Sequence, residues 1–227
     1  MPTILHIESS TKTCSICVAE KGRTIAIRES HDEQYSHAEK LAVFVDEVIK
    51  EVGGPDKLDA VCVSKGPGSY TGLRIGVSAA KGICFSLDIP LLSVTSLTSL
   101  TELARVSVDA KPEDTLMPMI DARRMEVYTA QFDAKGAQKT DISALIVDDK
   151  TKLSKVGTTF IFGDGSAKCK EVLNSEKVDH LADLKASAKG MSTIAETKFK
   201  AAEFEDVAYF EPFYLKEFVA GKPKKIF

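Results

Sequence analysis

A glycine-rich loop is the segment of this sequence with the clearest potential for chemistry. Residues 66–74 read GPGSYTGLR and stand between a β-branched run and a helical pattern. Glycines allow backbone conformations that other residues avoid, and the free amides at the start of a helix attract anions. The loop is not a P-loop, because Leu73 and Arg74 follow Gly72 where that motif requires lysine. Composition alone favours a tight strand-to-helix turn, with anion binding as the alternative.

Two cysteines with C-x-x-C spacing, Cys14 and Cys17, could support redox chemistry or supply half of a metal site. Both fall in a strand-like stretch, no second pair follows, and no helix start adjoins them to lower a thiol pKa. A structural role is therefore favoured. The chain has five cysteines, and this odd number in apolar patterns fits reduced thiols in a cytosol better than a disulfide framework.

The elements that would position the loop alternate between strands and helices. Strands are expected at residues 4–7, 13–19, 24–28, 60–63 and 90–94, and helices at 37–52 after a cap at Ser36, at 73–87 and at 95–106. Beyond a polar stretch at 108–114, strands are expected at 116–120, 126–132 and 159–162, and helices at 166–173 and 192–204. This order predicts an α/β fold with an N-terminal domain of residues 1–107 and a smaller C-terminal α/β domain of residues 108–227.

Composition limits the class of protein. The 227 residues are 44% apolar, which is enough for one large domain or two small ones. A net charge of -3 gives no overall positive field to attract a nucleic acid. The first residues lack a secretory pattern, and charges interrupt each strongly apolar stretch well before the length of a membrane helix. We therefore expect a cytoplasmic protein without membrane contact.

Four segments together resemble one family. Residues 66–82 (GPGSYTGLRIGVSAAKG) are similar to the signature that TsaB proteins share with their catalytic paralogues, the TsaD proteins. Residues 4–11 (ILHIESST) resemble the first phosphate turn of that family. Residues 93–97 (SVTSL) and 119–128 (MIDARRMEVY) continue the resemblance to TsaB, which covers most of the first 130 residues.

The resemblance implies the actin-like ATPase (ASKHA) fold, in which two RNase-H-like domains enclose a cleft and the second domain is reduced in TsaB proteins. The order of strands and helices predicts the same α/β class independently. Two positions depart from the family pattern: Tyr70 stands where phenylalanine is usual, and Met125 stands where glycine is usual.

The implied cleft would retain groups for binding a nucleotide. Glu8 could hold a hydrated Mg²⁺, so the resemblance predicts ATP or ADP with Mg²⁺ as an optional ligand, with no cofactor required. Structural roles in turns are an equally good interpretation, since Asp164 and Ser166 could cap the helix that follows them. The predicted cofactor-binding residues are Glu8, Ser10, Thr11, Gly68, Ser69 and Asp164.

The pattern of histidines argues against catalysis. The catalytic paralogue holds a metal with two histidines spaced H-x-x-x-H, because residues i and i+4 share one face of a helix. Here His37 is followed at i+4 by Leu41. The other histidines, His6, His31 and His180, lie in a strand, a loop and the second half of the chain. We therefore predict no catalytic residue and no metal site.

The helices expected at residues 37–52 and 73–87 carry a broad apolar face and a face of small residues, respectively, that could serve as an interface. The resemblance implies that these helices join TsaD, or a second copy of the chain, in a four-helix bundle. Ordinary packing against the chain's own sheet is the alternative. The predicted interface residues are His37, Leu41, Phe44, Val48, Gly72, Gly76 and Ala80.

The function implied by the resemblance is that of a non-catalytic dimerisation and activating subunit. It would support a TsaD-type catalytic subunit, which transfers threonylcarbamoyl to the tRNA adenosine beside the anticodon. The expected partners are that subunit and a TsaE-type ATPase, with a homodimer when the chain is alone and tRNA bound only through the complex. The alternatives are an ASKHA-type ATPase or kinase, and a glycoprotease-like metallopeptidase. The basic residues at 222–225 could touch RNA, although a solvated terminus is their usual meaning.

Overall fold

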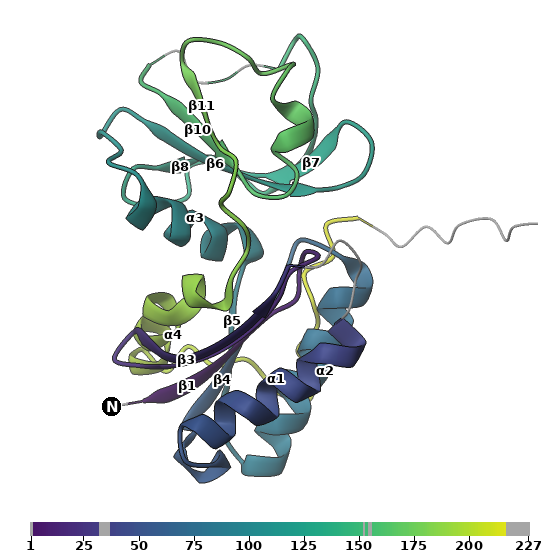
Figure 1. The fold of residues 1–227 in the computed structure, drawn as a ribbon, viewed down its shortest axis with the longest axis vertical. Coiled ribbons are helices and arrows are strands. Elements are labelled where there is room, and N and C mark those ends of the chain that lie inside the picture. Colours follow the sequence, from purple (N-terminus) through teal and green to yellow (C-terminus); the bar gives the residue numbers. More distant parts are fainter. Residues whose placement is uncertain (1, 32–36, 152, 154–155, 217–227) are drawn as a thin grey trace, which may run out of the picture.

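The protein, seen in a computed structural model, consists of two lobes, each built around one β-sheet (Figure 1). The structure describes residues 2–31, 37–151, 153 and 156–216. The expected helix cap at Ser36 and the basic residues at 222–225 lie outside the described residues. In the described part of the chain, no helix combines the length and the apolar character needed to cross a membrane.

The first lobe contains a mixed five-stranded sheet. Its strands are β1 (Thr3–Glu8), β2 (Cys14–Glu20), β3 (Arg23–Ser30), β4 (Ala60–Ser64) and β5 (Leu91–Val94). They lie in the order β3-β2-β1-β4-β5. The β1, β2 and β3 strands form an antiparallel meander, and β4 and β5 extend it in parallel to β1. β1 and β4 are buried along their whole length, because helices cover both faces of the sheet.

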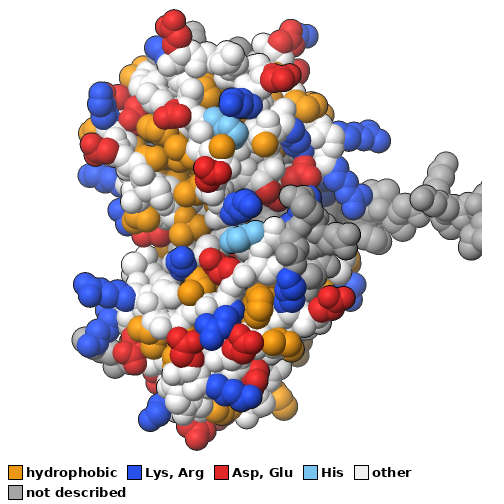
Figure 2. Space-filling model, in the orientation of Figure 1, with side chains coloured by type: hydrophobic (Ala, Val, Ile, Leu, Met, Phe, Trp, Pro, Cys, Tyr) orange, Lys and Arg blue, Asp and Glu red, His pale blue; other side chains and the backbone are white. Residues whose placement is uncertain are grey.

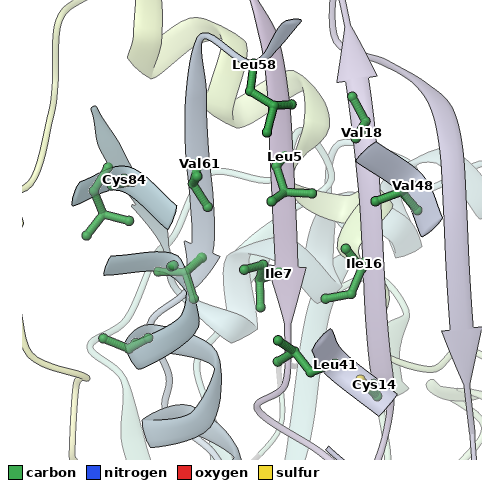
Figure 3. Packing of buried hydrophobic residues seen from close by; sticks show 14 of the residues in the cluster. Leu5, Ile7, Cys14, Ile16, Val18, Leu41, Val48, Leu58, Val61 and Cys84 are labelled. Carbon is green, nitrogen blue, oxygen red and sulfur yellow. The ribbon is translucent and has the colours of Figure 1, made fainter. Parts of the chain in front are cut away.

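Helices α1 (His37–Glu51) and α2 (Tyr70–Leu87) cover one face of this sheet (Figure 1). Apolar side chains on their inner sides, such as Leu41 and Val48, pack against Ile16 and its neighbours in the strands (Figure 3). The short 3-10 helix η1 (Pro55–Lys57) follows α1. Since Leu41 and Val48 are two helical turns apart, they form one stripe along the inner side of α1.

The opposite face of the first sheet is covered by a late part of the chain. The 3-10 helix η3 (Ala188–Met191) leads directly into helix α4 (Ser192–Lys200). Met191 and Ala195 are fully buried with Ile4 and other apolar residues of the sheet. The first lobe is therefore complete only when a segment nearly 200 residues along the chain returns to it.

The second lobe contains the sheet order β11-β10-β6-β7-β9, with β8 paired to β6. Its strands are β6 (Thr115–Asp121), β7 (Glu126–Thr129), β8 (Phe132–Asp133), β9 (Ser143–Ile146), β10 (Thr159–Phe162) and β11 (Val178–Leu181). Helix α3 (Ser96–Ser107) lies against this lobe (Figure 1), where Leu97 and Leu100 share a core with Phe132. The 3-10 helix η2 (Ala167–Cys169) covers another part. Helix α3 ends at residue 107 in the chain but packs in the second lobe. The predicted domain boundary at residue 107 stays a prediction.

The predicted α/β fold is confirmed, but some element limits differ. The strand expected at residues 126–132 is divided into β7 and β8, because the backbone amide of Gln131 turns away to the Thr140 hydroxyl. The helix expected at 166–173 is wrong; only the single turn η2 is helical there. The helix expected to reach residue 204 ends at Lys200, since Ala202 adopts a left-handed backbone with φ of 53°.

Candidate functional site

The glycine loop packs directly on the turn that follows β1. The backbone amide of Ser69 donates to the carbonyl of Ser10 at 2.6 Å. A Cβ atom at Gly68 would lie 2.2 Å from that same carbonyl oxygen, so only glycine fits there. The Ser69 hydroxyl caps α2 by accepting from the Gly72 amide at 3.2 Å. The loop amides of Ser69 and Gly72 are therefore engaged within the chain.

Glu8 ends β1 as a buried carboxyl group. Its Oε1 atom accepts hydrogen bonds from the Ser10 amide at 2.8 Å and from the Ser10 hydroxyl at 2.6 Å. Its Oε2 atom makes no hydrogen bond within the described residues. Burial raises the pKa of Glu8, while the hydroxyl groups of Ser10 and Ser64 partly offset that rise and the charge of Asp164 adds to it.

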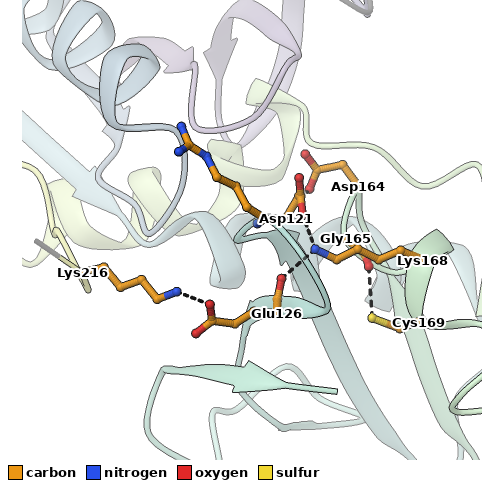
Figure 4. Close-up of polar contacts among 8 residues, drawn as sticks. Asp121, Glu126, Asp164, Gly165, Lys168, Cys169 and Lys216 are labelled. Carbon is orange, nitrogen blue, oxygen red and sulfur yellow. Dashed lines mark hydrogen bonds and ion pairs between the residues drawn. The ribbon is translucent and has the colours of Figure 1, made fainter. Parts of the chain in front are cut away.

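Asp164 approaches this region from the second lobe, in the turn after β10 (Figure 4). Its Oδ1 atom accepts from the Asp121 amide at 3.0 Å. Desolvation by the surrounding protein raises the pKa of Asp164, and the charge of Asp121 adds a smaller increase. The charges of Lys12 and Lys168 act against that rise. The side chain nevertheless reaches solvent, and water limits the effect. Glu8 and Asp164 thus face each other's charge from two lobes, as the implied cleft requires.

The predicted nucleotide site is only partly consistent with this geometry. Glu8 offers a carboxylate oxygen with no hydrogen bond among the described residues, which suits a hydrated Mg²⁺. The glycine loop, however, touches Ser10 directly, so no phosphate could lie between the loop and the β1 turn. Thr11 is buried beside this contact. In the described ranges, no three His, Cys, Asp or Glu side chains are grouped to hold a metal ion. Nucleotide binding stays a prediction.

The predicted interface residues on α1 lie mostly inside the chain. His37 is buried, and its Nε2–H donates to the Thr11 carbonyl at 2.8 Å. Burial lowers the pKa of His37, which favours the neutral imidazole. Leu41 and Val48 belong to the core of the first lobe, and Phe44 is half-buried against it. Intramolecular packing therefore accounts for this stripe, and its interface role stays a prediction.

The small residues predicted as interface on α2 also face inward. A Cβ atom at Gly72 would lie 2.1 Å from the Ser9 carbonyl oxygen, and one at Gly76 would lie 2.1 Å from the Ser9 Oγ atom. Ala80 is fully buried. These small residues let α2 approach the end of β1 closely, because no side chain separates the two backbones. The stripe needs no partner to explain it.

The outward side of the two helices carries different residues, which the sequence did not single out. Phe85 on α2 exposes 85% of its surface, and Val43 on α1 exposes 52%. Ser78 and Gly82 are exposed beside Phe85 along α2. The sequence shows Val43 and Phe85 as apolar residues within helical segments, but their positions alone do not show which side of each helix faces the sheet.

A cleft of about 650 Å³ opens between the lobes, next to the glycine loop. The outline of the molecule narrows between the lobes, and charges of both signs are interspersed over the visible face (Figure 2). The start of α2, the turn between β6 and β7, and the segment at residues 213–216 line this interlobe cleft. Its chemically distinctive residues are Tyr70, Tyr128, Tyr214, Arg123, Arg124 and Lys216. The sequence predicted only its Gly68 and Ser69 edge.

The chain matches known proteins over nearly its full length. The family model described as "TsaD: tRNA N6-adenosine threonylcarbamoyltransferase" matches residues 31–224. An Escherichia coli protein named "tRNA threonylcarbamoyladenosine biosynthesis protein TsaB" is 26% identical over 229 aligned residues, which cover 96% of each chain. The chain belongs to the TsaB (YeaZ) family. The resemblance drawn from its loop and strand motifs is confirmed.

Another TsaB relative is matched over a smaller share of the chain. The Haemophilus influenzae protein of the same name is 32% identical over 130 residues, covering 57% of this chain and 53% of its own. The match thus spans about half the length of that relative. The solved structure of YeaZ from Pseudomonas aeruginosa has a TM-score of 0.80 at 24% identity, covering 95% of this chain and 100% of its own. This likeness confirms the predicted α/β fold.

Proposed function

We propose that this TsaB-family chain acts in the cytoplasm in the biosynthesis of threonylcarbamoyladenosine on tRNA, as a non-catalytic partner of a TsaD-type transferase. The match of the TsaD family model to residues 31–224 carries this proposal, together with the TsaB name of the relatives. The expected assembly contains the TsaD-type subunit and a TsaE-type ATPase, and the chain alone would form a homodimer.

The state of His37 supports a non-catalytic role. A helical metal site needs a second ligand four residues later, but that position holds Leu41, which is buried in the core. The His37 imidazole already donates to the Thr11 carbonyl and fixes the start of α1 to the β1 turn. Both side chains therefore serve the fold, and neither is available to hold a metal at the surface.

The outward face of α1 and α2 supports a role in assembly. Phe85 and Val43 are strongly exposed apolar side chains on the two adjacent helices. Ser78 and Gly82 provide a low surface beside Phe85, on which a partner helix could approach closely. Aromatic side chains of this kind often dominate binding energy. We assign this face to the TsaD-type subunit, and expect two copies of the chain to use it when that subunit is absent.

The experiment is reconstitution of tRNA modification from this chain, a TsaD-type subunit, a TsaC-type adenylate-forming enzyme and a TsaE-type ATPase. Modified adenosine is measured by mass spectrometry of digested tRNA. We expect modification to require this chain, and Phe85→Glu to weaken binding of the TsaD-type subunit about tenfold or more. Val106→Glu, at an exposed apolar position on α3, is the matched control and should change neither quantity. Equal modification without the chain would exclude the proposed function.

ATP or ADP with Mg²⁺ remains part of the proposal only as an optional ligand. The Glu8 carboxyl, with its Oε2 atom lacking a hydrogen bond in the described chain, is the group that supports this suggestion. Calorimetry with Mg-ATP on wild type and on Glu8→Gln tests it, with phosphate release followed in parallel. Turnover by the isolated chain would instead support the ATPase or kinase alternative.

A further inference from the structure

The interlobe cleft combines aromatic rings and cations from three separate segments. The Tyr70 and Tyr214 rings lie with centroids 4.8 Å apart at an angle of 34°. The Arg74 guanidinium lies 5.5 Å from the Tyr70 centroid, and the Lys216 ammonium lies 5.8 Å from the Tyr128 centroid. Three tyrosine rings and the Lys216 ammonium thus line one hollow, and the Arg74 guanidinium lies beside it. Rings combined with positive groups are typical of grooves that bind single-stranded nucleic acids.

The charge balance of the cleft is positive, although the whole chain has a net charge of -3. Its two acidic lining residues are already paired: Asp121 with Lys168, and Glu126 with Lys216 (Figure 4). Arg123 and Arg124 are exposed, and within the described ranges neither forms an ion pair. The cleft therefore presents two guanidinium groups whose charge is not neutralised by a neighbouring carboxylate.

The backbone of these two arginines adopts an unfavourable conformation. Arg123 and Arg124 have φ angles of 69° and 49°. Left-handed backbone is unfavourable for a residue that carries a side chain, and glycine or asparagine would adopt it more readily. The turn is held by the Arg123 amide, which donates to Asp121 Oδ1 at 3.1 Å, and by the Ala122 amide, which donates to the Glu126 carbonyl at 3.1 Å. Two adjacent arginines in this conformation point to a use for their side chains.

The contacts at the rim bring the same groups together. The Arg123 charge is close enough to lower the pKa of Tyr128, although burial of that phenol is the larger effect and raises it. Burial likewise raises the pKa of Tyr214; the Arg74 charge acts against that rise, and the acidic neighbour Glu211 adds to it. Tyrosines and arginines of both lobes therefore lie within interaction range of one another.

We infer that the interlobe cleft binds an unpaired nucleotide, with its phosphate on Arg123 and Arg124 and its base against the tyrosine rings. Guanidinium groups pair with phosphate oxygens in a planar, bidentate manner, and every base offers a face for stacking. The ligand of this class is single-stranded RNA; a free nucleotide has the same chemistry. The identification of that RNA as tRNA rests on the proposed function. This contact would belong to the chain itself, whereas the sequence led us to expect tRNA contact only through partners.

The experiment measures binding of a fluorescently labelled 12-residue single-stranded oligoribonucleotide to the full chain by anisotropy. The double variant Arg123→Gln/Arg124→Gln should bind at least tenfold more weakly, and the slope of log affinity against log salt should fall by about 1.4 if two phosphate contacts are lost. Arg105→Gln is the matched control, because Arg105 is paired with Glu102 on α3 away from the cleft. Tyr214→Ala should weaken binding about fivefold or more, and Tyr214→Phe should not.

Three further arms identify the ligand. Duplex RNA should bind more weakly than the single strand, and AMP or ATP should compete only at much higher concentration. If a free nucleotide competes at a concentration equal to that of the oligonucleotide, and this competition is lost in the arginine variant, the cleft is a binding site for a mononucleotide. Equal binding by wild type and the arginine variant, or a preference for duplex, would overturn the inference. Because this assay uses the chain alone, its result is independent of whether reconstituted modification requires the chain.

Discussion

Replacement of Gly76 by alanine tests whether the small residues of α2 face the chain's own sheet. A Cβ atom at this position would lie 2.1 Å from Ser9 Oγ, 3.3 Å from Ser9 Cβ and 3.4 Å from Ile7 Cγ2. The first of these distances is far below van der Waals contact, so the Ser9 hydroxyl would have to move. That hydroxyl donates to the Gly72 carbonyl at 2.9 Å, and the hydrogen bond would be lost.

Three effects set the expected magnitude. Alanine is about 1 kcal/mol more favourable than glycine in a helix interior. Crowding of a packed core costs about 1 to 3 kcal/mol, and loss of the buried hydrogen bond costs about 1 kcal/mol more. The sum predicts that Gly76→Ala lowers the free energy of unfolding by about 1 to 3 kcal/mol. Gly82→Ala is the matched control, since nothing lies within 4 Å of its Cβ position, and it should raise stability by about 0.5 to 1 kcal/mol.

The assay is urea unfolding of each variant, followed by circular dichroism. A second test uses the Ser9→Ala background, in which the 2.1 Å contact is absent. There, Gly76→Ala should cost at least about 1 kcal/mol less than in the wild type, a coupling expected of residues in direct contact. If Gly76→Ala stabilises the chain as much as Gly82→Ala does, the inward assignment of the α2 stripe is wrong.

Three other predictions concern buried titratable groups. Burial lowers the pKa of His6 to about 4 in the folded chain, whereas the unfolded chain binds a proton at His6 below about pH 6.5. Because folding excludes that proton, the free energy of unfolding of the wild type should fall by about 3 kcal/mol more than that of His6→Leu between pH 7 and pH 4. Burial raises the pKa of Glu8, so its charge opposes folding as pH rises above the ordinary carboxyl range, and Glu8→Gln should stabilise the chain at pH 8 but not at pH 4; an unchanged difference would contradict this. All five cysteines are buried, and burial raises the thiol pKa of Cys14 to about 11 and that of Cys17 to about 12. Iodoacetamide at pH 8 should therefore label the cysteines only in denaturant, which intact-mass measurement will show.

The elements that the sequence predicted best are those determined by local patterns. The alternation of apolar strands with amphipathic helices in the first 94 residues placed β1 to β5, α1 and α2 close to their observed limits. The contact between the glycine loop and the β1 turn also follows from the fold, because both segments leave the sheet at the same edge. The residues of the second half have shorter elements, and their limits were less predictable.

The parts that could not be predicted depend on contacts between distant segments. Tyr70 meets Tyr214 and Glu126 meets Lys216 only after the chain has folded, and no local spacing relates those positions. The coverage of the first sheet by Met191 and its neighbours is of the same kind. The pairing of Arg123 and Arg124 was visible as a dipeptide, but its left-handed backbone and its place in a cleft were not.

The direction of the α2 stripe has a consequence for how assembly and stability are related. Since Gly72, Gly76 and Ala80 are occupied by contacts with the first sheet, substitutions there should destabilise the monomer before they affect any partner. Phe85 lies on the opposite side and makes little contact with its own chain, so its replacement should leave the stability of the monomer nearly unchanged. The two sides of one helix can therefore be perturbed separately, and a loss of partner binding in Phe85→Glu at unchanged stability would be an effect on assembly alone.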